Sequence, residues 1–163
     1  MTRRALAVGV PLVAAVAAGA VLVATASSST LRDEETLRQR HAEVLRAHRE
    51  SNVDLLLVDA VEDFVLANRG EIGRPTLEER RARFNSYLGR TRFDEYRDLT
   101  EPVVRVSKDG TLGWVIAQVR AKGVQKSDAG AAEPIAFQSA WIELYEKRAG
   151  RWVAIGNVSN FKP

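Results

Sequence analysis

The sequence predicts an α+β domain in which helices come first and a long, bent antiparallel sheet follows. Helical patterns fill much of residues 31–88, and alternating strand patterns fill most of residues 92–161. The last two strands, Pro134–Lys147 and Arg151–Phe161, are long compared with the ~5–6 residues of a common strand. A tight turn at Arg148-Ala149-Gly150 joins them. Long strands joined in this way indicate a curved sheet, and the preceding helices can cover it.

Length and composition bound the classes of function. The 163 residues allow one domain and a short targeting segment. The net charge is 24 − 21 = +3, and removing Arg3 and Arg4 of the leader leaves only +1 for residues 31–163. We therefore expect no nucleic-acid partner. The chain has no cysteine, which excludes disulfides and thiolate catalysis, and we expect neither a metal nor a cofactor.

Residues 1–30 read as a signal peptide or an N-terminal membrane anchor. A short positive start precedes an apolar run over residues 5–24, and Ala24-Thr25-Ala26 fits the small-x-small pattern of a cleavage site. The run is also long enough to span a bilayer if it stays uncleaved. We favour cleavage, with a soluble mature chain that begins near Ser27. In either case we expect an exported domain, either secreted or periplasmic, or held on the outer side of a membrane.

Three helices are predicted. The first covers residues 31–50, with Thr30 or Asp33 as its cap. Its apolar stripe is made of Leu37, His41, Val44, Leu45 and His48. The second is short, about Val53–Val61. The third opens on the capping box of Thr76 and Glu79 and ends near Leu88.

The strands are bounded by turn residues. Asp63–Ala67 is a predicted strand that ends in the turn Asn68-Arg69-Gly70. Residues 92–107 are extended but interrupted near Pro102. Lys108-Asp109-Gly110 is typical of a hairpin turn, followed by the strand Thr111–Val124 and a polar loop over residues 125–133.

Three phrases resemble the nuclear transport factor two-like superfamily, in its SnoaL-like branch. They are the end of the first helix at His48–Asp54, the Asp63-Phe64 start of a strand, and the terminal hairpin Tyr145–Trp152. The chain departs from the family pattern at Ser51-Asn52, where Gly-Asp is usual. The resemblance covers about residues 33–161 and predicts one SnoaL-like domain over residues 31–163. It implies a cone-shaped curved antiparallel sheet, covered by three N-terminal helices, as in cystatin-like folds.

The resemblance also implies a pocket between the concave sheet face and the helices. Enzymes of the family use an Asp or Glu as base, assisted by Tyr, His or a second acid. The candidate catalytic residues here are His48, Asp63, Asp59 and Tyr87. The expected pocket lining is His48, Phe64, Phe84, Tyr87, Trp114 and Trp141. His41, within the packed stripe, is expected to be structural.

Three functions remain open at this point. The first is a domain that binds a small apolar molecule without catalysis. The second is an isomerase-like or cyclase-like enzyme that moves protons in the same pocket. The third is an anchored interaction module. Because apolar side chains occur on both faces of the strands at 111–119 and 135–145, we also expect a homodimer built on the uncovered face.

Overall fold

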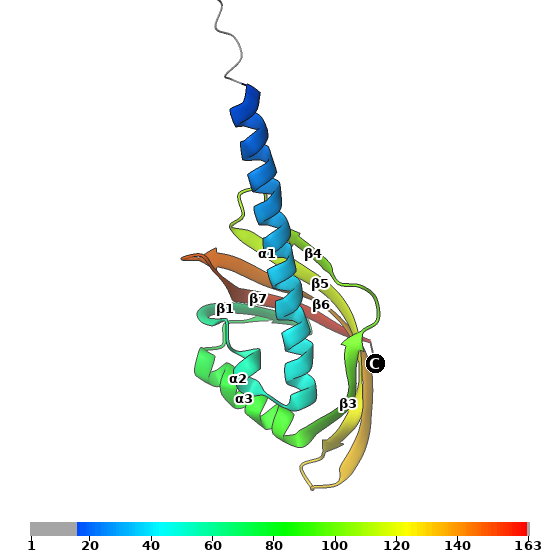
Figure 1. Ribbon diagram of the computed structural model, residues 1–163. Coiled ribbons are helices and arrows are strands. Elements are labelled where there is room, and N and C mark those ends of the chain that lie inside the picture. Colours follow the sequence, from blue (N-terminus) through cyan, green and yellow to red (C-terminus); the bar gives the residue numbers. More distant parts are fainter. Residues whose placement is uncertain (1–15, 163) are drawn as a thin grey trace, which may run out of the picture.

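The computed structural model describes residues 16–162, with side chains from Ser28 onward. The helices are α1 (Val16–Glu50), α2 (Val53–Leu56) and α3 (Leu77–Arg90). The strands are β1 (Ala60–Asn68), β2 (Glu71–Gly73), β3 (Thr91–Asp98), β4 (Val103–Val106), β5 (Leu112–Lys126), β6 (Ala132–Arg148) and β7 (Arg151–Lys162). The α+β prediction with three N-terminal helices is therefore confirmed (Figure 1).

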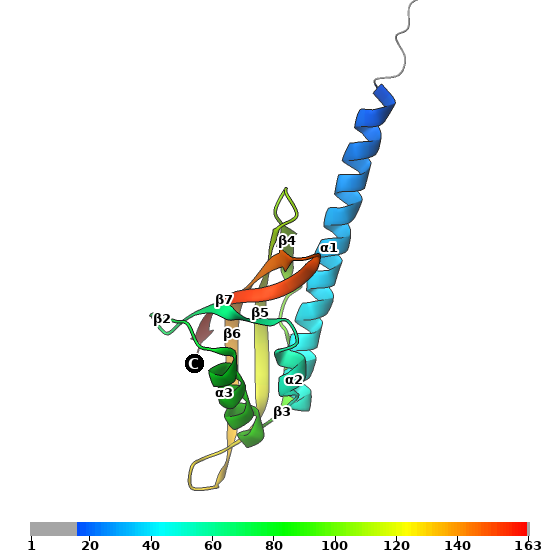
Figure 2. The same ribbon diagram turned by 90° about the vertical axis from the view of Figure 1, so that its left-hand side faces the viewer.

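The seven strands form one curved sheet in the order β2-β1-β7-β6-β5-β3, with β4 paired to β5. Every pair is antiparallel except β1 with β7, which run parallel, so the sheet is mixed and not purely antiparallel as expected. The parallel pair arises because the chain crosses the whole sheet between its first strand and its last. The helices lie within the curve of the sheet (Figures 1 and 2).

Helix α1 is longer than predicted. It starts at Val16 and runs without a break through the expected cleavage site and through both expected caps. Asp33 does not cap it, because it lies inside the helix. Its carboxylate accepts hydrogen bonds from Lys147 Nζ at 2.6 Å and Trp152 Nε1 at 3.1 Å. Among residues 16–162, no helix is both long and apolar enough to cross a membrane.

Local signals of the sequence are confirmed at the turns and caps. Thr76 and Glu79 form the predicted capping box at the start of α3. Ala149 and Gly150 make the tight β6–β7 turn with φ values of 48° and 81°. Ser51 adopts a left-handed φ of 53° where the family places glycine, and Asn52 caps α2. Helix α2 ends five residues before the predicted Val61, since β1 already begins at Ala60.

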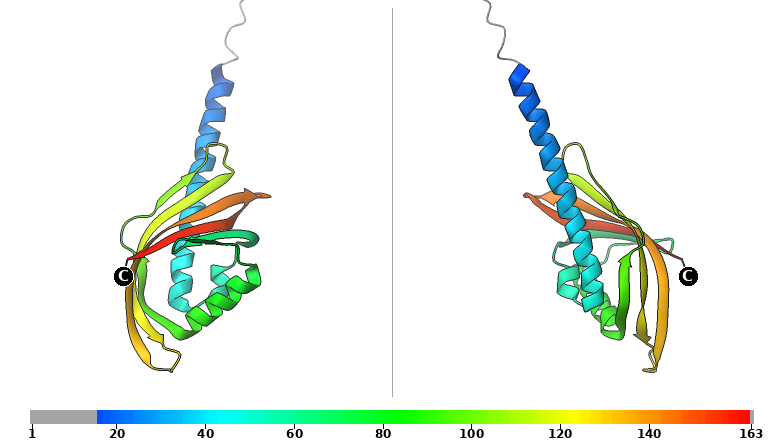
Figure 3. Two further views of the ribbon diagram at one scale, coloured as in Figure 1. Left: turned by 180° about the vertical axis from the view of Figure 1, so that it is seen from behind. Right: turned by 45° about the vertical axis from the view of Figure 1, so that its right-hand side comes forward.

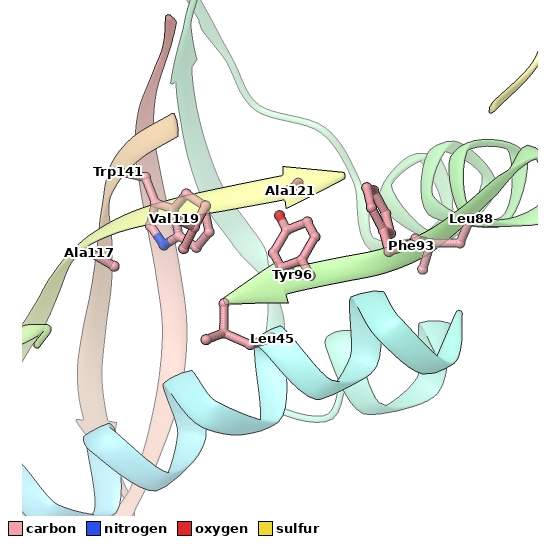
Figure 4. Packing of buried hydrophobic residues seen from close by; sticks show 8 residues of the cluster. All are labelled: Leu45, Leu88, Phe93, Tyr96, Ala117, Val119, Ala121 and Trp141. Atoms are coloured by element: carbon pink, nitrogen blue, oxygen red, sulfur yellow. The ribbon is translucent and has the colours of Figure 1, made fainter. Parts of the chain in front are cut away.

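The core consists of two apolar clusters on the concave, helix-covered face of the sheet. The larger one contains Leu45, Leu88, Phe93, Tyr96, Ala117, Val119, Ala121 and Trp141 (Figure 4). The smaller one contains Leu37, Val104, Val115, Tyr145 and Trp152. Leu37 and Leu45 belong to the predicted stripe of α1, so that helix contributes to both clusters. His41 lies between them on the same stripe.

The other side of the sheet, which we call the open face, carries no helix among the described elements. Residues of β5 alternate between the buried Val115, Ala117 and Val119 and the more exposed Trp114, Ile116 and Gln118. Seen from behind, β5, β6 and β7 lie in front of α1 (Figure 3, left). The structure thus answers which face is concave, which the alternation alone left undecided.

The β3–β5 pairing depends on a glycine with no room for a side chain. A Cβ added at Gly123 would lie 2.1 Å from the Arg92 carbonyl oxygen and 2.9 Å from the Phe93 Cα, next to the bulge of β3. We expect Gly123→Ala to lower the free energy of unfolding by about 1–3 kcal/mol or more, because the backbone of β3 must shift. Chemical denaturation measures this.

Gly89→Ala is the matched control for this substitution. Nothing lies within 4 Å of a Cβ at Gly89, which is inside α3, and alanine there should raise the stability by about 0.5–1 kcal/mol. Equal effects of the two alanines would contradict the assigned close approach of β3 and β5.

Candidate functional site

The most organised group of polar side chains lies in the core, between the two apolar clusters. His41 of α1 donates from Nδ1 to Glu143 Oε1 of β6 at 2.8 Å, and from Nε2 to Asp98 Oδ1 at the end of β3 at 3.0 Å. His41 is 1% exposed and Glu143 is 7% exposed. The imidazole therefore bridges two carboxylates that come from distant parts of the chain.

Glu143 is the centre of this group. Trp141 Nε1 donates to its Oε1 at 2.7 Å, and the Tyr145 hydroxyl donates to its Oε2 at 2.8 Å. Trp141, Glu143 and Tyr145 alternate along β6 and so share the concave face. Burial raises the pKa of Glu143, but His41, Trp141 and Tyr145 together outweigh it and leave the pKa below its ordinary value. Glu143 is therefore an ionised carboxylate that accepts two hydrogen bonds at Oε1 and one at Oε2.

His41 is correspondingly a cation. Burial alone would lower its pKa, but the hydrogen bonds to Asp98 and Glu143 and their negative charges raise it to about 9. Both ring nitrogens already donate, and the ring is shielded from solvent. The arrangement can hold an imidazolium in place, but it offers no free nitrogen to a substrate. We assign it a structural role, as the sequence predicted for His41.

His48, the leading catalytic candidate, is also buried. Its Nδ1 donates to the Val44 carbonyl oxygen at 2.8 Å, and its ring stacks on Tyr96 with 4.3 Å between centroids. Burial lowers the pKa of His48 to about 4. The ring is therefore neutral near pH 7, and among the described residues it forms no hydrogen bond or ion pair with a carboxylate. It lies in an aromatic environment and not beside a base.

The two carboxylate candidates, Asp59 and Asp63, form ion pairs with arginines and make no contact with His48. Asp59 forms an ion pair with Arg40 Nε at 2.9 Å, near the α2 carbonyls of Leu55 and Leu56 that Arg40 also binds. Asp63 is 62% exposed and forms a bidentate pair with Arg148, which lowers the pKa of Asp63. Both carboxylates therefore belong to structural ion pairs, with Asp59 directly before β1 and Asp63 within it.

Tyr87 is the one candidate beside His48. Its ring lies edge-on to His48 with 6.4 Å between centroids, and it is half-buried. Burial raises the pKa of the Tyr87 phenol to about 12. The structure thus brings together His48 and Tyr87, whereas Asp59 and Asp63 have other partners.

The residues expected to line one pocket lie on different elements and on both faces of the sheet. Phe64 is buried beneath the Arg80 guanidinium, whose Cζ lies 3.7 Å from the ring centroid. Phe84 is half-buried on α3. Trp141 is buried on the concave face, but Trp114 lies on the open face, because Trp114 pairs with Leu144 and Ala117 pairs with Trp141. The two tryptophans therefore cannot line one pocket.

The concave interior is filled by rings. Phe93 and Tyr96 lie 4.8 Å apart between centroids, and Phe137 lies 6.4 Å from each of them. Two hollows of the molecule lie at other places, and only the second has a residue of this ring group, Phe137, in its lining. One, of about 430 Å³, is lined by Leu66, Gly73, Arg74, Pro75, Glu79 and Arg83. The other, of about 220 Å³, is lined by Arg120, Ala121, Lys122, Ala136, Phe137, Gln138 and Lys162.

Glu143 and Asp98 were not among the predicted site residues. A single glutamate in a strand ordinarily faces solvent. The signal in the sequence was the alternation along β6, which places Glu143 on the same face as the aromatic residues Trp141 and Tyr145. Nothing local links it to His41, which is 102 residues away in sequence.

Comparisons with solved structures identify the fold. An NTF2-like protein of unknown function from Pseudomonas putida matches with a TM-score of 0.64 and 13% identity, over 80% of this chain and 87% of that one. A ketosteroid isomerase-like protein from Erwinia carotovora atroseptica matches with a TM-score of 0.57 and 18% identity, over 77% and 93%.

A third structure is a putative calcium/calmodulin-dependent kinase II association domain from Exiguobacterium sibiricum. It matches with a TM-score of 0.58 and 14% identity, over 84% of this chain and 94% of that one. No protein-family model and no curated protein matches the sequence. The chain thus has the nuclear transport factor two-like α+β fold, while its assignment to the SnoaL-like branch stays a prediction.

His41 makes the stability depend on pH on the alkaline side. Its pKa is raised from 6.5 to about 9 in the folded chain, so its contribution is fully present below pH 6.5 and is lost as the pH rises through about 9. The contribution is on the order of 3 kcal/mol. We expect denaturant unfolding to show this loss in the wild type and a much smaller one in His41→Gln. A parallel decline in both proteins would refute the assignment.

His48 acts in the opposite direction. Its pKa is lowered from 6.5 to about 4, so the folded state loses stability as the pH falls below 6.5, on the order of 2 kcal/mol at about pH 5. His48→Phe keeps a ring, and the Val44 carbonyl keeps its helical bond to the backbone N–H of residue 48. We expect the variant to fold and to lack this acid-side loss in the same unfolding assay. An unchanged acid-side loss would show that His48 is not its source.

Proposed function

We propose that this chain is an exported assembly module that pairs with a second copy of itself through the open face of its sheet. The observation that carries the proposal is an apolar row across four strands of that face. Val103 of β4 pairs with Ile116 of β5, Ile116 pairs with Ile142 of β6, and Ile142 pairs with Val158 of β7. Because directly paired residues share one face of a sheet, the four side chains lie next to one another. Their face is the one that no described helix covers (Figure 3).

The row is exposed to a degree that is unusual for residues of its size. Val103, Ile116 and Val158 are 47%, 42% and 45% exposed, and Ile142 between them is half-buried. Trp114 and Leu144, paired with each other, extend the apolar surface by a second row. Arg105 of β4 pairs with Trp114 at the outer end of this second row, so the apolar patch has a cation at its edge. An apolar patch with a polar rim is typical of an interface.

A second copy is the occupant that this surface fits best. Ile142 has an exposed β-branched residue on each side, Ile116 and Val158. A two-fold axis near Ile142 would therefore place the apolar row of one copy against the apolar row of the other. The face also offers the breadth of several strands, and a stable pair buries ~800 Å² on each partner. One solved structure with this fold is named a putative association domain, which adds support for a role in assembly.

The two pocket-based functions have less support from the geometry. For a small apolar molecule to enter the cone, the rings of Phe93, Tyr96 and Phe137 would have to move apart. For proton transfer, a carboxylate would have to approach His48, whereas Asp59 and Asp63 are engaged by Arg40 and Arg148. The interior is used for packing, and the open face is left for recognition.

Export rests on the leader, residues 1–30. Cleavage after Ala26 is compatible with the fold, because anchoring contacts of α1 such as Asp33 with Lys147 and Leu37 in the smaller cluster lie downstream of it. Mass spectrometry of exported protein should find a chain that begins near Ser27. An intact start at Met1 or Thr2 would indicate an anchored module instead.

The assembly proposal predicts that charge on the apolar row separates the copies. We expect the wild type to be a dimer at micromolar concentration, measured by light scattering after size exclusion. Ile116→Glu with Val158→Glu should weaken the pair by about 100-fold or more, because carboxylates would be buried in the contact. The melting temperature of the variant reports whether its fold is kept.

Ile72→Glu is the matched control. Ile72 is more exposed, at 76%, but belongs to β2 at the edge of the sheet and not to the row. This variant should remain dimeric. A wild-type protein that is monomeric at micromolar concentration, or a control that dissociates as readily as the double variant, would refute the proposal.

A further inference from the structure

The open face becomes basic beyond the apolar row. Continuing along the strands, the next row is Gln118, Ala140 and Asn160, and the row after that is Arg120, Gln138 and Lys162, paired in register on β5, β6 and β7. Lys122 lies on the same face one row further. Neighbouring strands are ~5 Å apart, so the side chains of Arg120, Gln138 and Lys162 stand next to one another.

The positive charge of this region is largely uncompensated. Arg97 of β3 lies directly opposite Arg120, an arrangement of like charges that destabilises a sheet. The Glu95 carboxylate forms ion pairs with Arg97 at 2.8 Å and with Lys122 at 3.6 Å. Within residues 28–162, no carboxylate lies within 4.0 Å of the nitrogens of Arg120 or Lys162. Four cations and one carboxylate leave a local charge of +3.

Three of these cations line a hollow with a volume of about 220 Å³. Its polar lining is Arg120, Lys122, Gln138 and Lys162, and its apolar lining is Ala121, Ala136 and Phe137. That volume corresponds to about seven water molecules at ~30 Å³ each, enough for a phosphate group with a small substituent. Arg120 is half-buried and Gln138 is half-buried, which limits the directions in which their donors can point.

We infer that this hollow binds the phosphate group of a small organic phosphate. A guanidinium supplies paired N–H donors, two ammonium groups supply point charge, and the amide of Gln138 supplies a neutral donor. The site is separate from the buried His41–Glu143 group and from the apolar row. It does not depend on the proposed assembly.

The experiment is a titration followed by amide NMR shifts at constant ionic strength. Inorganic phosphate, phenyl phosphate and acetate are the probes, and sodium chloride is the reference. We expect saturable shifts at residues 120–122 and 136–138, with at least a tenfold lower Kd for the phosphates than for acetate. A lower Kd for phenyl phosphate than for inorganic phosphate assigns the site to organic phosphates.

The variant is Arg120→Gln with Lys162→Gln, and the control is Lys108→Gln. Lys108 is an exposed cation in the turn before β5, at the far end of the same sheet. The double variant should lose at least tenfold in affinity, and the control should bind as the wild type does. Dispersed spectra of both variants establish that they are folded.

Several results would overturn the inference. Shifts that do not saturate, or that sodium chloride reproduces, would reduce the site to general screening. Equal affinity for acetate and phosphate would refute the ligand class. A lower Kd for inorganic phosphate than for phenyl phosphate would also refute it. Loss of binding in the dimer-breaking Ile116→Glu, Val158→Glu protein would show that one chain alone does not form the site, whereas retained binding supports it.

Discussion

The ionised Glu143 carboxylate is the constraint around which the interior of this domain is arranged. A buried carboxylate is costly unless hydrogen bonds and an opposite charge compensate it. Here the compensation comes from α1 through His41 and from β6 itself through Trp141 and Tyr145. Each of these partners has to adopt one position for the carboxylate to be satisfied. The group therefore fixes the rotation and the depth of α1 against the sheet.

The rest of the structure follows from this arrangement. With His41 fixed, Leu37 and Leu45 fall one turn to either side and close the two apolar clusters. Asp98 draws the end of β3 to the helix, so the sheet curls around α1. The aromatic rings then fill the space that an enzyme of this shape would leave for a substrate. The interior is thus closed by packing, and the open face is the apolar surface that stays accessible.

Short-range signals in the sequence were sufficient for most elements. The capping box of Thr76, the Asp109-Gly110 turn and the Ala149-Gly150 turn depend on neighbouring residues and could be predicted. The β1–β7 pairing and the contacts of Glu143 join residues far apart, and no local pattern encodes them. The upstream part of α1 was missed because its composition resembles a leader. Trp114 was misplaced because its partner strand decides which face it occupies.

The uninterrupted length of α1 has a mechanical consequence. A helix of 35 residues is about 52 Å long, at ~1.5 Å per residue, and its lower half is fastened to the sheet at Asp33, His41 and Arg49. A pull applied at its upstream end is carried along the helix axis to all three attachments together. The load is shared in shear and is not borne by one contact after another.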